Sequence, residues 1–360
     1  MTLISQRNTI QNRLFNVPTT PKFPTTRYQG SKSKYVDWIW ACVKDLSFHS
    51  VLDAFGGTSV VSYKFKKHGK QVTYNDILFF NSIIGKALIE NDSEQLTTED
   101  LEFILTKHDD MDYPNFIERT FEDVYYTDEE NRWLDVVITN ISHVLNDYKR
   151  AIAYFALFQA CIIKRPYNLF HRKNLYIRFQ EVKRSFGNKV TWDTSFDSHF
   201  KNFVKEANNA IFSNYKKNVS INKNICEVVN NFDLVYIDTP YISESGVGLD
   251  YLDFYHFLEG ITHYKEWEKM IDPKSKHKRL KLNGSDWSKK DRIESAFESL
   301  IHQFKDSILV ISYRSNGIPS IDQIKTILVN NGKKVTIHES KEMKYALSKR
   351  KSNEVLIIGE

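Results

Sequence analysis

The sequence predicts an α/β fold organised around an open, mostly parallel β-sheet. Short apolar runs of strand length alternate with helical patterns along most of the chain. One run, Leu234–Ile237, ends abruptly in Asp-Thr-Pro-Tyr, and another, beginning at Val51, enters a glycine turn. Because proline cannot continue a central strand, residues 238–241 should lie on a loop just past the strand's carboxyl end. Open α/β sheets bind their ligands at that edge.

The Asp-Thr-Pro-Tyr loop combines hydrogen-bond acceptors with an aromatic ring. Asp238 supplies a carboxylate, Thr239 supplies a carbonyl on a peptide stiffened by Pro240, and Tyr241 supplies a flat ring. Together these groups suit a planar heterocycle held by its exocyclic amino group and stacked on one face. Taken alone, the same four residues are equally well explained as a capped strand end.

Bulk composition restricts the class of protein. The 360 residues are 41% hydrophobic and 26% charged, which indicates a globular protein with a sizeable core. The net charge of +5 permits a polyanionic partner without requiring one. The three cysteines lie far apart and lack C-x-x-C spacing, which argues against a disulfide framework or a zinc site. With no run of membrane-spanning length and no signal-peptide core, we expect a soluble, cytoplasmic protein.

The N-terminal part contains a candidate ligand loop. Residues 1–26 hold three prolines and form an extended lead-in. Arg27-Tyr-Gln-Gly-Ser-Lys32 then precedes an amphipathic helical segment over residues 35–46. Ser31 or Ser33 would cap this helix and leave backbone N–H groups and Lys32 near its positive end, a site that attracts an anion. By itself, a Ser-Lys pair before a helix is usually only a cap.

The next segment carries the strongest cofactor signal. Residues 51–59 form a strand, a glycine turn (Phe55-Gly-Gly-Thr-Ser) and the start of a helix that ends near residue 68. This pattern brings backbone close to a cofactor, but it is not G-x-G-x-x-G, which disfavours a dinucleotide. The second strand, over residues 72–74, ends in Asn75-Asp76, about 20 residues past the turn, where an acid can bind ribose hydroxyls. Asp76 would equally well cap the next helix. The two signals together favour a nucleoside cofactor.

Residues from about 78 to 165 follow helical patterns, and the composition then shifts. The segment 164–178 interleaves basic residues with aromatic rings and amides. Such side chains position phosphates, contact base edges and stack on bases, although a basic segment is often only a solvated loop. We predict nucleic-acid contacts from Lys164, Arg165, Tyr167, Asn168, His171, Arg172, Lys173 and Arg178.

The remaining chain completes the alternation. A helix is expected over residues 198–217, and the aromatic segment 249–258 enters a helix that either covers the pocket or belongs to the core. Residues 271–291 form an exposed basic loop, with eight lysines or arginines between Lys274 and Arg292, where a DNA backbone contact is conceivable. The last expected elements are a strand at 308–311, a helix at 320–329, and strands at 334–338 and 354–358.

In their order along the chain, these motifs resemble the Dam-like, alpha-group DNA adenine-N6 methyltransferases. That family runs R-Y-x-G-S-K, F-x-G-x-G, a target-recognition insertion, and D-P-P-Y. Here 183 residues separate Phe55 from Asp238, which suits the insertion. There are two departures: Ser59 replaces the last glycine of the turn, and Thr239 replaces a proline. Because threonine also supplies the backbone carbonyl used at that position, we expect activity to survive.

The resemblance implies a fold and a division of the chain. The fold would be that of an S-adenosylmethionine (SAM)-dependent methyltransferase, Rossmann-like, with a mixed seven-stranded sheet and an inserted, mainly helical target-recognition domain. Residues 1–92 would form the N-terminal arm and the SAM-binding half. Residues 93–228 would form the insertion, and residues 229–360 the catalytic half.

The resemblance also implies a cofactor and a catalytic site. SAM would be converted to S-adenosylhomocysteine, and no metal is needed. Lys32 and the loop before it would hold the methionine carboxylate, and Asp76 would bind the ribose. The implied cofactor-binding residues are Arg27, Tyr28, Gly30, Lys32, Asp53, Phe55, Gly56, Gly57, Thr58, Asn75, Asp76 and Asp238. The implied catalytic residues are Asp238, Thr239, Pro240 and Tyr241.

The implied activity is sequence-specific methylation of adenine N6 in double-stranded DNA. The adenine would flip out of the duplex and stack on Tyr241. Its amino group would donate one hydrogen bond to Asp238 and one to the Thr239 carbonyl. We expect the modification enzyme of a restriction–modification system, monomeric and cytoplasmic in a bacterium or phage. A cognate endonuclease would act on the same site without stable binding. The alternatives are methylation of cytosine N4, RNA or a protein amide, and a catalytically silent nucleic-acid-binding relative. Intact Asp238 and Tyr241 argue against the last.

Overall fold

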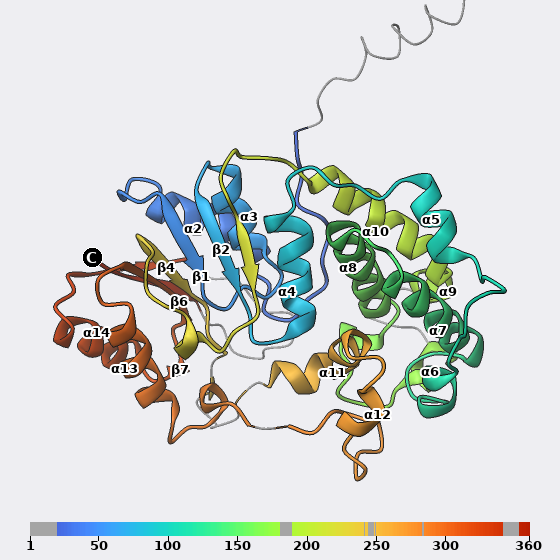
Figure 1. Cartoon of the computed structure of the whole chain (residues 1–360). Helices are drawn as coiled ribbons and strands as arrows, with labels where there is room; N and C mark the ends of the chain where they lie inside the picture. The colour runs from blue at the N-terminus through green and yellow to red at the C-terminus, as the bar shows by residue number, and fades with distance from the viewer. Residues whose placement is uncertain are drawn as a thin grey trace, which may run out of the picture.

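The computed structural model describes residues 20–180, 189–240, 242–243, 248, 250–282, 284–340 and 353–360. A seven-stranded sheet lies on one side of the molecule, and a group of helices lies on the other (Figure 1). The strand order is β3-β2-β1-β4-β6-β9-β8. Strand β9 pairs antiparallel with β6 and β8, and it runs opposite to the other six strands of this sheet. The expected α/β fold with a mixed seven-stranded sheet is therefore confirmed.

The course of the chain through the sheet determines where a ligand can bind. After β1 the chain adds β2 and β3 on one side, and it resumes with β4 on the other side of β1. The carboxyl ends of the neighbouring strands β1 and β4 therefore form the topological switch point, where open α/β sheets bind ligands. The strands are β1 Ser50–Asp53, β2 Gln71–Asn75, β3 Val219–Ile221, β4 Leu234–Ile237, β6 Ile308–Arg314, β8 Val335–Glu339 and β9 Glu354–Gly359, with a separate ladder of β5 Ile242–Ser243 and β7 Gly317–Ile318.

Helices cover both faces of the sheet. Leu234 and Tyr236 of β4 pack in one cluster with α2 and α3, while Val235 and Ile237 pack in a second cluster with α13 and α14. All four strand residues are buried, which explains why β4 appears in the sequence as an uninterrupted apolar run. The covering helices are α2 Val36–Val43, α3 Val60–Lys67, α13 Ile293–Gln303 and α14 Ile321–Asn330.

The other half of the molecule is helical. Helix α10 lies along α8, and both pack toward α4 and the π-helical turn that follows it. The elements of this half are α4 Phe79–Gly85, η2 Lys86–Glu90, α5 Thr98–Leu105, α6 Phe116–Thr120, α7 Asp128–Ser142, α8 Asp147–Ile163, α9 Lys189–Asp193, α10 Phe196–Ala210, α11 Tyr251–Thr262 and α12 Trp267–Met270. Short 3-10 turns are η1 Lys32–Lys34, η3 Pro166–Asn168, η4 Leu175–Arg178, η5 Ile225–Glu227 and η6 Asp286–Ser288.

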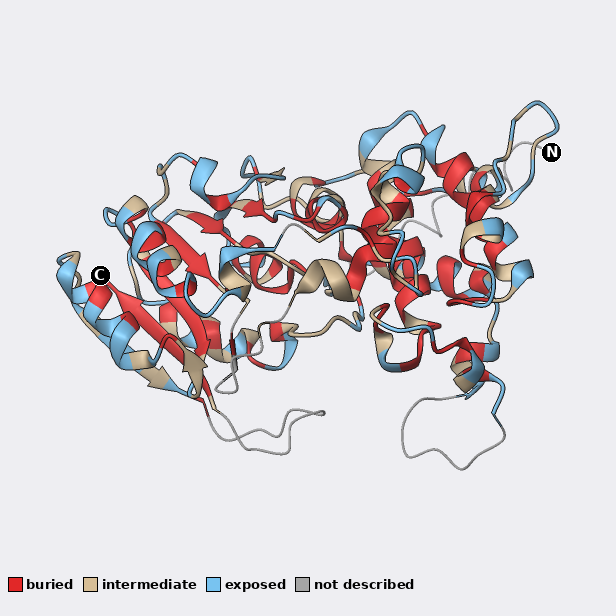
Figure 2. Ribbon diagram, turned by 90° about the horizontal axis from the view of Figure 1, so that it is seen from below, coloured by how far each residue is buried: buried red, intermediate tan, exposed pale blue. Residues whose placement is uncertain are grey.

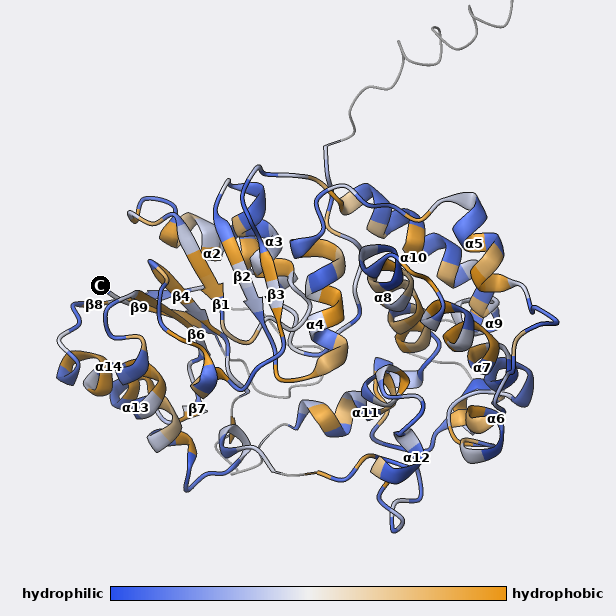
Figure 3. Ribbon diagram, viewed as in Figure 1, coloured by the Kyte–Doolittle hydropathy of each residue, from blue (hydrophilic) through white to orange (hydrophobic). Residues whose placement is uncertain are grey.

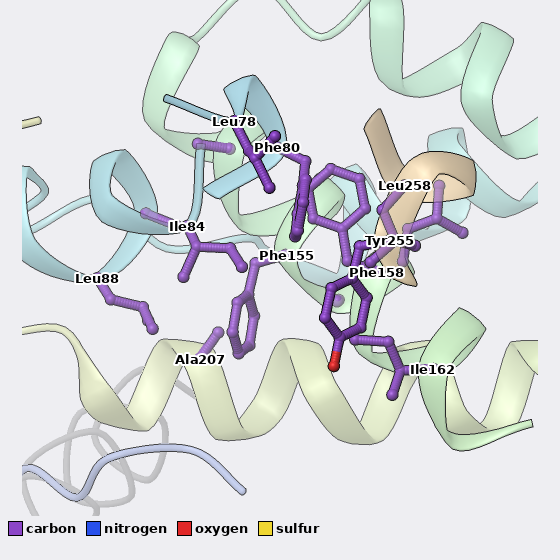
Figure 4. Packing of buried hydrophobic residues seen from close by; sticks show 14 of the residues in the cluster. Leu78, Phe80, Ile84, Leu88, Phe155, Phe158, Ile162, Ala207, Tyr255 and Leu258 are labelled. Atoms are coloured by element: carbon purple, nitrogen blue, oxygen red, sulfur yellow. The ribbon is translucent and has the colours of Figure 1, made fainter. Parts of the chain in front are cut away.

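The helical half shares one hydrophobic core with the sheet. Phe80 of α4, Phe155 and Phe158 of α8, Ala207 of α10 and Tyr255 of α11 meet in this core (Figure 4). Buried residues accordingly run through both halves (Figure 2), and the hydropathy pattern places apolar residues in the strands and hydrophilic ones on the outer helices (Figure 3). The insertion is thus continuous with the sheet half in its packing.

Two sequence expectations need adjustment. An insertion ending at residue 228 is too long, because β3 at Val219–Ile221 already pairs with β2 in the sheet. The helix expected at 198–217 is α10, which ends at Ala210. Within the described parts of the chain, no helix is long and apolar enough to cross a membrane.

Candidate active site

An open pocket of about 750 Å³ lies at the carboxyl ends of β1 and β4, at the switch point of the sheet. The three loops predicted from the sequence converge there with the start of α4 and α11. The lining residues are Tyr28, Gln29, Gly30, Ser31, Lys32, Asp53, Phe55, Gly56, Gly57, Thr58, Val60, Val61, Asp76, Ile77, Leu78, Asn81, Tyr236, Asp238, Pro240 and Tyr251.

Close packing shapes the glycine turn. A Cβ atom on Gly56 would lie 2.0 Å from the ring of Tyr74, whose hydroxyl donates to the Gly57 carbonyl at 2.8 Å. Gly57 has φ +49°, and Ser59, which occupies the usual position of the last glycine, has φ +63°. A non-glycine residue in this left-handed region costs about 1–2 kcal/mol. Ser59 therefore adopts the glycine conformation at that cost.

Two buried carboxylates flank the turn. Asp53 accepts a hydrogen bond from Ser62 Oγ at 2.7 Å through Oδ2, while its buried Oδ1 has no partner among the described residues. Burial raises the pKa of Asp53 to about 7. Asp76 accepts from the backbone N–H groups of Gly57 and Leu78, both at 2.9 Å, and burial raises its pKa to about 6. Asp76 thus stabilises the turn that leads into α4 and also lines the pocket, although the N-cap residue of α4 is Leu78; ribose binding by Asp76 stays a prediction.

Lys32 lies between two carboxylates of the protein itself. Its Nζ is 2.9 Å from Asp238 Oδ1 and 3.0 Å from Glu354 Oε1. Burial lowers the Lys32 pKa, but the two carboxylates outweigh it and the net shift is upward. Burial raises the pKa of Asp238 to about 6 against the opposing charge of Lys32. The expectation that Lys32 holds a ligand carboxylate, or forms an anion site, is therefore replaced by a role in orienting Asp238.

The sequence did not reveal Glu354 as part of the site. It is the first residue of β9, is 1% exposed, and accepts from Ser312 Oγ at 2.6 Å. The sequence signal that could have identified Glu354 is an acidic residue at the start of an otherwise apolar strand. Asn81 of α4 was also missed: its Nδ2 donates to the Tyr28 hydroxyl at 3.2 Å, and its buried Oδ1 has no partner in the ranges described.

The pocket has a clear electrostatic preference. Asp53, Asp76 and Asp238 line it together with Lys32, whose charge is shared between Asp238 and Glu354. Among the lining residues, the buried polar atoms without partners in the described part of the chain are Asp53 Oδ1, Asn81 Oδ1 and the Tyr236 hydroxyl, and the first two act only as acceptors. Acceptors of this kind, with an excess of negative charge, favour a ligand that is cationic and rich in hydrogen-bond donors.

Three stacked tyrosines lie beside the pocket, and two of them, Tyr28 and Tyr251, line it. The Tyr28 ring is stacked between Tyr251, at 5.8 Å and 3°, and Tyr255, at 4.3 Å and 10°. The Tyr255 hydroxyl accepts from the Gln29 N–H at 2.7 Å, and Tyr251 packs so closely on Gly30 that a Cβ there would lie 2.4 Å from its hydroxyl. Tyr251 lines the pocket and Tyr255 belongs to the core, so the aromatic segment serves in both of the ways expected.

The predicted catalytic tetrapeptide lies partly on the pocket wall. Asp238 and Pro240 line the pocket. Thr239 is 3% exposed and is not among the lining residues, and its hydroxyl has no partner in the described structure. Tyr241 lies outside the described residues.

Two predicted cofactor residues do not reach the pocket. Arg27 is exposed and is absent from the lining. Asn75 is buried and is used by the backbone: its Nδ2 donates to the Ala54 carbonyl and its Oδ1 accepts from Lys223 N–H, both at 3.1 Å. Asn75 therefore joins the ends of neighbouring strands. The other ten predicted residues all line the pocket.

Three of the predicted DNA contacts are instead structural. Lys164 and Arg178 are buried and both pair with Glu130, at 2.8 and 2.7 Å. Arg165 is 1% exposed and donates to the carbonyls of Tyr125, Leu169 and Arg172 and to the Asn174 side chain. These side chains are therefore unable to contact DNA in this structure, and the prediction was wrong for them. Their internal partners hold the segment in place.

The other five predicted DNA contacts lie nearer the surface. Arg172 and Lys173 are exposed, and Tyr167 is 44% exposed. Tyr167 and Asn168 have positive φ angles of +64° and +59°, so the backbone is strained in the turn that these two residues form. His171 is partly buried, with its ring 5.6 Å from that of Phe254.

Comparison with known proteins decides the family. A family model for D12 class N6 adenine-specific DNA methyltransferases matches residues 28–327. The chain belongs to this family. The matched range includes the glycine turn, the pocket acids and the Asp-Thr-Pro-Tyr loop.

Individual relatives agree with this assignment. The chain is 30% identical, over 94% of its length, to the type II methyltransferase M2.HphI of Haemophilus parahaemolyticus, of which it covers 98%. It is 24% identical to the type II methyltransferase M.NlaIII of Neisseria lactamica over 85% of its length, covering 88% of that protein. It is 26% identical to the type II methyltransferase M.FokI of Planomicrobium okeanokoites over 85% of its length, but spans only 47% of that relative.

Proposed function

We propose that the chain transfers the methyl group of SAM to the N6 amino group of a flipped adenine in double-stranded DNA, as the modification enzyme of a restriction–modification system. One observation carries the proposal: Asp238, fixed by Lys32, lies on the wall of an acid-lined pocket at the switch point of the sheet. The names of the type II relatives support the restriction–modification context.

The pocket fits SAM in charge and in hydrogen bonding. SAM supplies an electrophilic methyl group on a sulfonium centre. The unpaired Oδ1 atoms of Asp53 and Asn81 are acceptors for a cationic, donor-rich ligand. Each Asp76 oxygen keeps a lone pair beyond its backbone bond, which suits ribose hydroxyls. The product, S-adenosylhomocysteine, lacks the sulfonium charge, so the acidic pocket attracts it less than it attracts SAM.

The residues around Asp238 prepare it to receive an amino group. Glu354 pairs with Lys32, Lys32 holds the Asp238 carboxylate in one orientation, and the positive charge of Lys32 favours the ionised form of Asp238. Asp238 and the Thr239 carbonyl would each accept a hydrogen bond from one amino N–H of the target base and stabilise the positive charge that develops on nitrogen. Tyr241 would stack on the extruded ring and offset part of the few kcal/mol that flipping costs.

The exposed part of the basic segment would contact DNA. Arg172 and Lys173 would position the phosphate backbone, while Tyr167, Asn168 and His171 would approach bases. We further propose that the chain acts as a monomer in the cytoplasm, associated with the nucleoid through DNA. A cognate endonuclease would recognise the same site without a stable complex.

One second candidate follows from the same geometry. A carboxylate and a carbonyl recognise an exocyclic amino group, and cytosine N4 offers that group as well. Genomic DNA from a methylation-free host that expresses the chain distinguishes the two when it is sequenced with modified-base detection. We expect N6-methyladenine at a single sequence motif. N4-methylcytosine would favour the second candidate, and unmodified DNA would contradict both.

A further inference from the structure

A compact basic loop follows α12 and contacts the first turn of α11, the helix whose first residue, Tyr251, lines the cofactor pocket. Residues 271–281, here called the lysine loop, are closed by a bridge between Ile271 and Leu280 and by a hydrogen bond from Lys281 N–H to the Met270 carbonyl at 2.9 Å. Three exposed lysines, 274, 276 and 278, extend from it, and none forms an ion pair with a described residue. The turn therefore presents three ammonium groups to solvent from a fixed backbone.

The acids near the lysine loop are already paired. Arg279 lies 3.7 Å from Asp253 of α11 and 3.3 Å from Asp272 of the loop itself. These contacts attach the loop to the first turns of α11. They also offset the nearest negative charges, so the outward face of the lysine loop is positive.

A second basic loop is attached to the same part of α11. The Arg172 loop, defined as residues 169–174, donates from the Phe170 N–H to the Phe254 carbonyl at 2.9 Å. Tyr251, at the start of α11, lines the cofactor pocket. Because a helix rises 1.5 Å per residue, Phe254 is about 4.5 Å along the axis from the pocket wall. The exposed Arg172 and Lys173 therefore belong to a loop anchored close to the pocket.

A buried tyrosine joins the two loops. Tyr125 Oη lies 2.5 Å from the carbonyl of Phe170 in the Arg172 loop and 3.0 Å from the carbonyl of His277 in the lysine loop. His256 Nε2 is 2.7 Å from the same oxygen. Burial lowers the His256 pKa to about 3, so the ring is neutral, and the single hydroxyl proton of Tyr125 faces the two carbonyls. The Arg165 guanidinium carbon lies over the Tyr125 ring, 4.2 Å from its centroid. The same guanidinium donates to the Arg172 carbonyl and so holds the Arg172 loop.

We propose that the lysine loop and the Arg172 loop form one composite surface that binds the phosphate backbone of duplex DNA beside the flipped base, with Tyr125 as the residue that positions both. The inference rests on the proposed function and extends it, because it assigns a DNA-binding role to the lysine loop. Both loops dock on α11, which lies on the side of the helical half that faces the sheet (Figure 1). Lysines act as point charges that grip phosphate without reading sequence, which suits holding a distorted backbone.

The salt dependence of DNA binding tests the surface. The variant with Lys274→Ala, Lys276→Ala and Lys278→Ala is compared with wild type on a fluorescein-labelled duplex that carries the mapped target sequence. Because each phosphate contact contributes about 0.9 to the slope of log affinity against log salt, we expect the slope between about 50 and 200 mM salt to fall by about 2–3. A matched control removes three exposed lysines that precede β1, β6 and β8 at the opposite edge of the sheet, Lys44, Lys305 and Lys334. Its slope should equal that of wild type.

Tyr125→Phe tests the positioning role without removing a charge. We expect a reduced salt slope and a raised KM for DNA, with SAM affinity retained, whereas a merely structural role would lower the unfolding temperature and leave the slope unchanged. A wild-type slope in the triple lysine variant would overturn the composite surface, and a wild-type slope in Tyr125→Phe would overturn the role of the tyrosine. Failure of the wild-type chain to methylate DNA is a separate outcome, which contradicts the proposed function itself.

Discussion

Replacing Asp53 with asparagine should make the free protein more stable and the cofactor site weaker. Asp53 is 1% exposed, and one of its oxygens accepts from Ser62 while the other has no partner in the described chain. The introduced asparagine can keep its carbonyl toward Ser62, which would direct its NH2 group to the place where the carboxylate now offers an acceptor. The substitution removes a buried charge with almost no change in shape.

The pKa of Asp53 sets the size of the stability effect. It is raised from 3.8 to about 7, mainly by burial, and one pKa unit is worth about 1.4 kcal/mol, which gives about 4 kcal/mol. Since the folded pKa is above the unfolded one, ionised Asp53 destabilises the fold fully above pH 7, and this penalty disappears as the pH falls toward 4. Asp53→Asn should therefore be more stable by up to about 4 kcal/mol at alkaline pH, with a flatter pH profile.

The expected binding effect has the opposite sign. Losing a hydrogen bond to a charged group costs about 1.5–3 kcal/mol, so the Kd for SAM should rise about 10- to 150-fold. Urea unfolding from pH 5 to pH 8 and calorimetric titration with SAM measure the two effects on one preparation. An unchanged pH profile of stability, or unchanged SAM affinity, would refute the argument about Asp53.

Three further substitutions test other parts of the site. Lys32→Met should lower the free energy of unfolding by about 3–5 kcal/mol in urea at pH 8, because it leaves Asp238 and Glu354 buried without their cation, and acid should restore part of the loss; a change under about 1 kcal/mol would contradict this. Ser59→Gly should raise unfolding stability by about 1 kcal/mol relative to Ser59→Ala, which keeps the left-handed strain, and equal stabilities would remove the strain argument. Tyr241→Ala should reduce the fluorescence rise of a duplex with 2-aminopurine at the target position, and an unaltered rise would count against stacking.

The sequence predicted the parts of the fold that depend on local signals. The apolar run before Asp238 and the proline after it fixed the end of β4, and the glycine turn fixed the end of β1. Because parallel strands bring their carboxyl ends to one edge, these two local signals were enough to place the pocket. The return of the chain to the sheet at β3 depends on long-range pairing with β2 and was not predicted, whereas β9, an apolar run, was predicted at residues 354–358.

The errors concern charged residues whose partners are distant in sequence. Lys164 and Arg178 looked like surface charges, but both pair with Glu130, which caps helix α7 at a distant point in the chain. Lys32 looked like part of an anion site, but Glu354, at the start of the last strand, and Asp238 neutralise it. A basic segment with interspersed aromatic rings has the same local pattern whether its charges are solvated or buried. Only the fold distinguishes the two.

The central claim is that Asp238 receives the amino group of adenine beside bound SAM. The most direct measurement gives wild type and Asp238→Ala the same unmethylated DNA and SAM labelled on its methyl group, and identifies the labelled nucleoside after digestion. We predict label in N6-methyladenine for wild type, and none for Asp238→Ala although it still binds SAM in a calorimetric titration. Transfer by Asp238→Ala at the wild-type rate, or label in another nucleoside, would contradict the account.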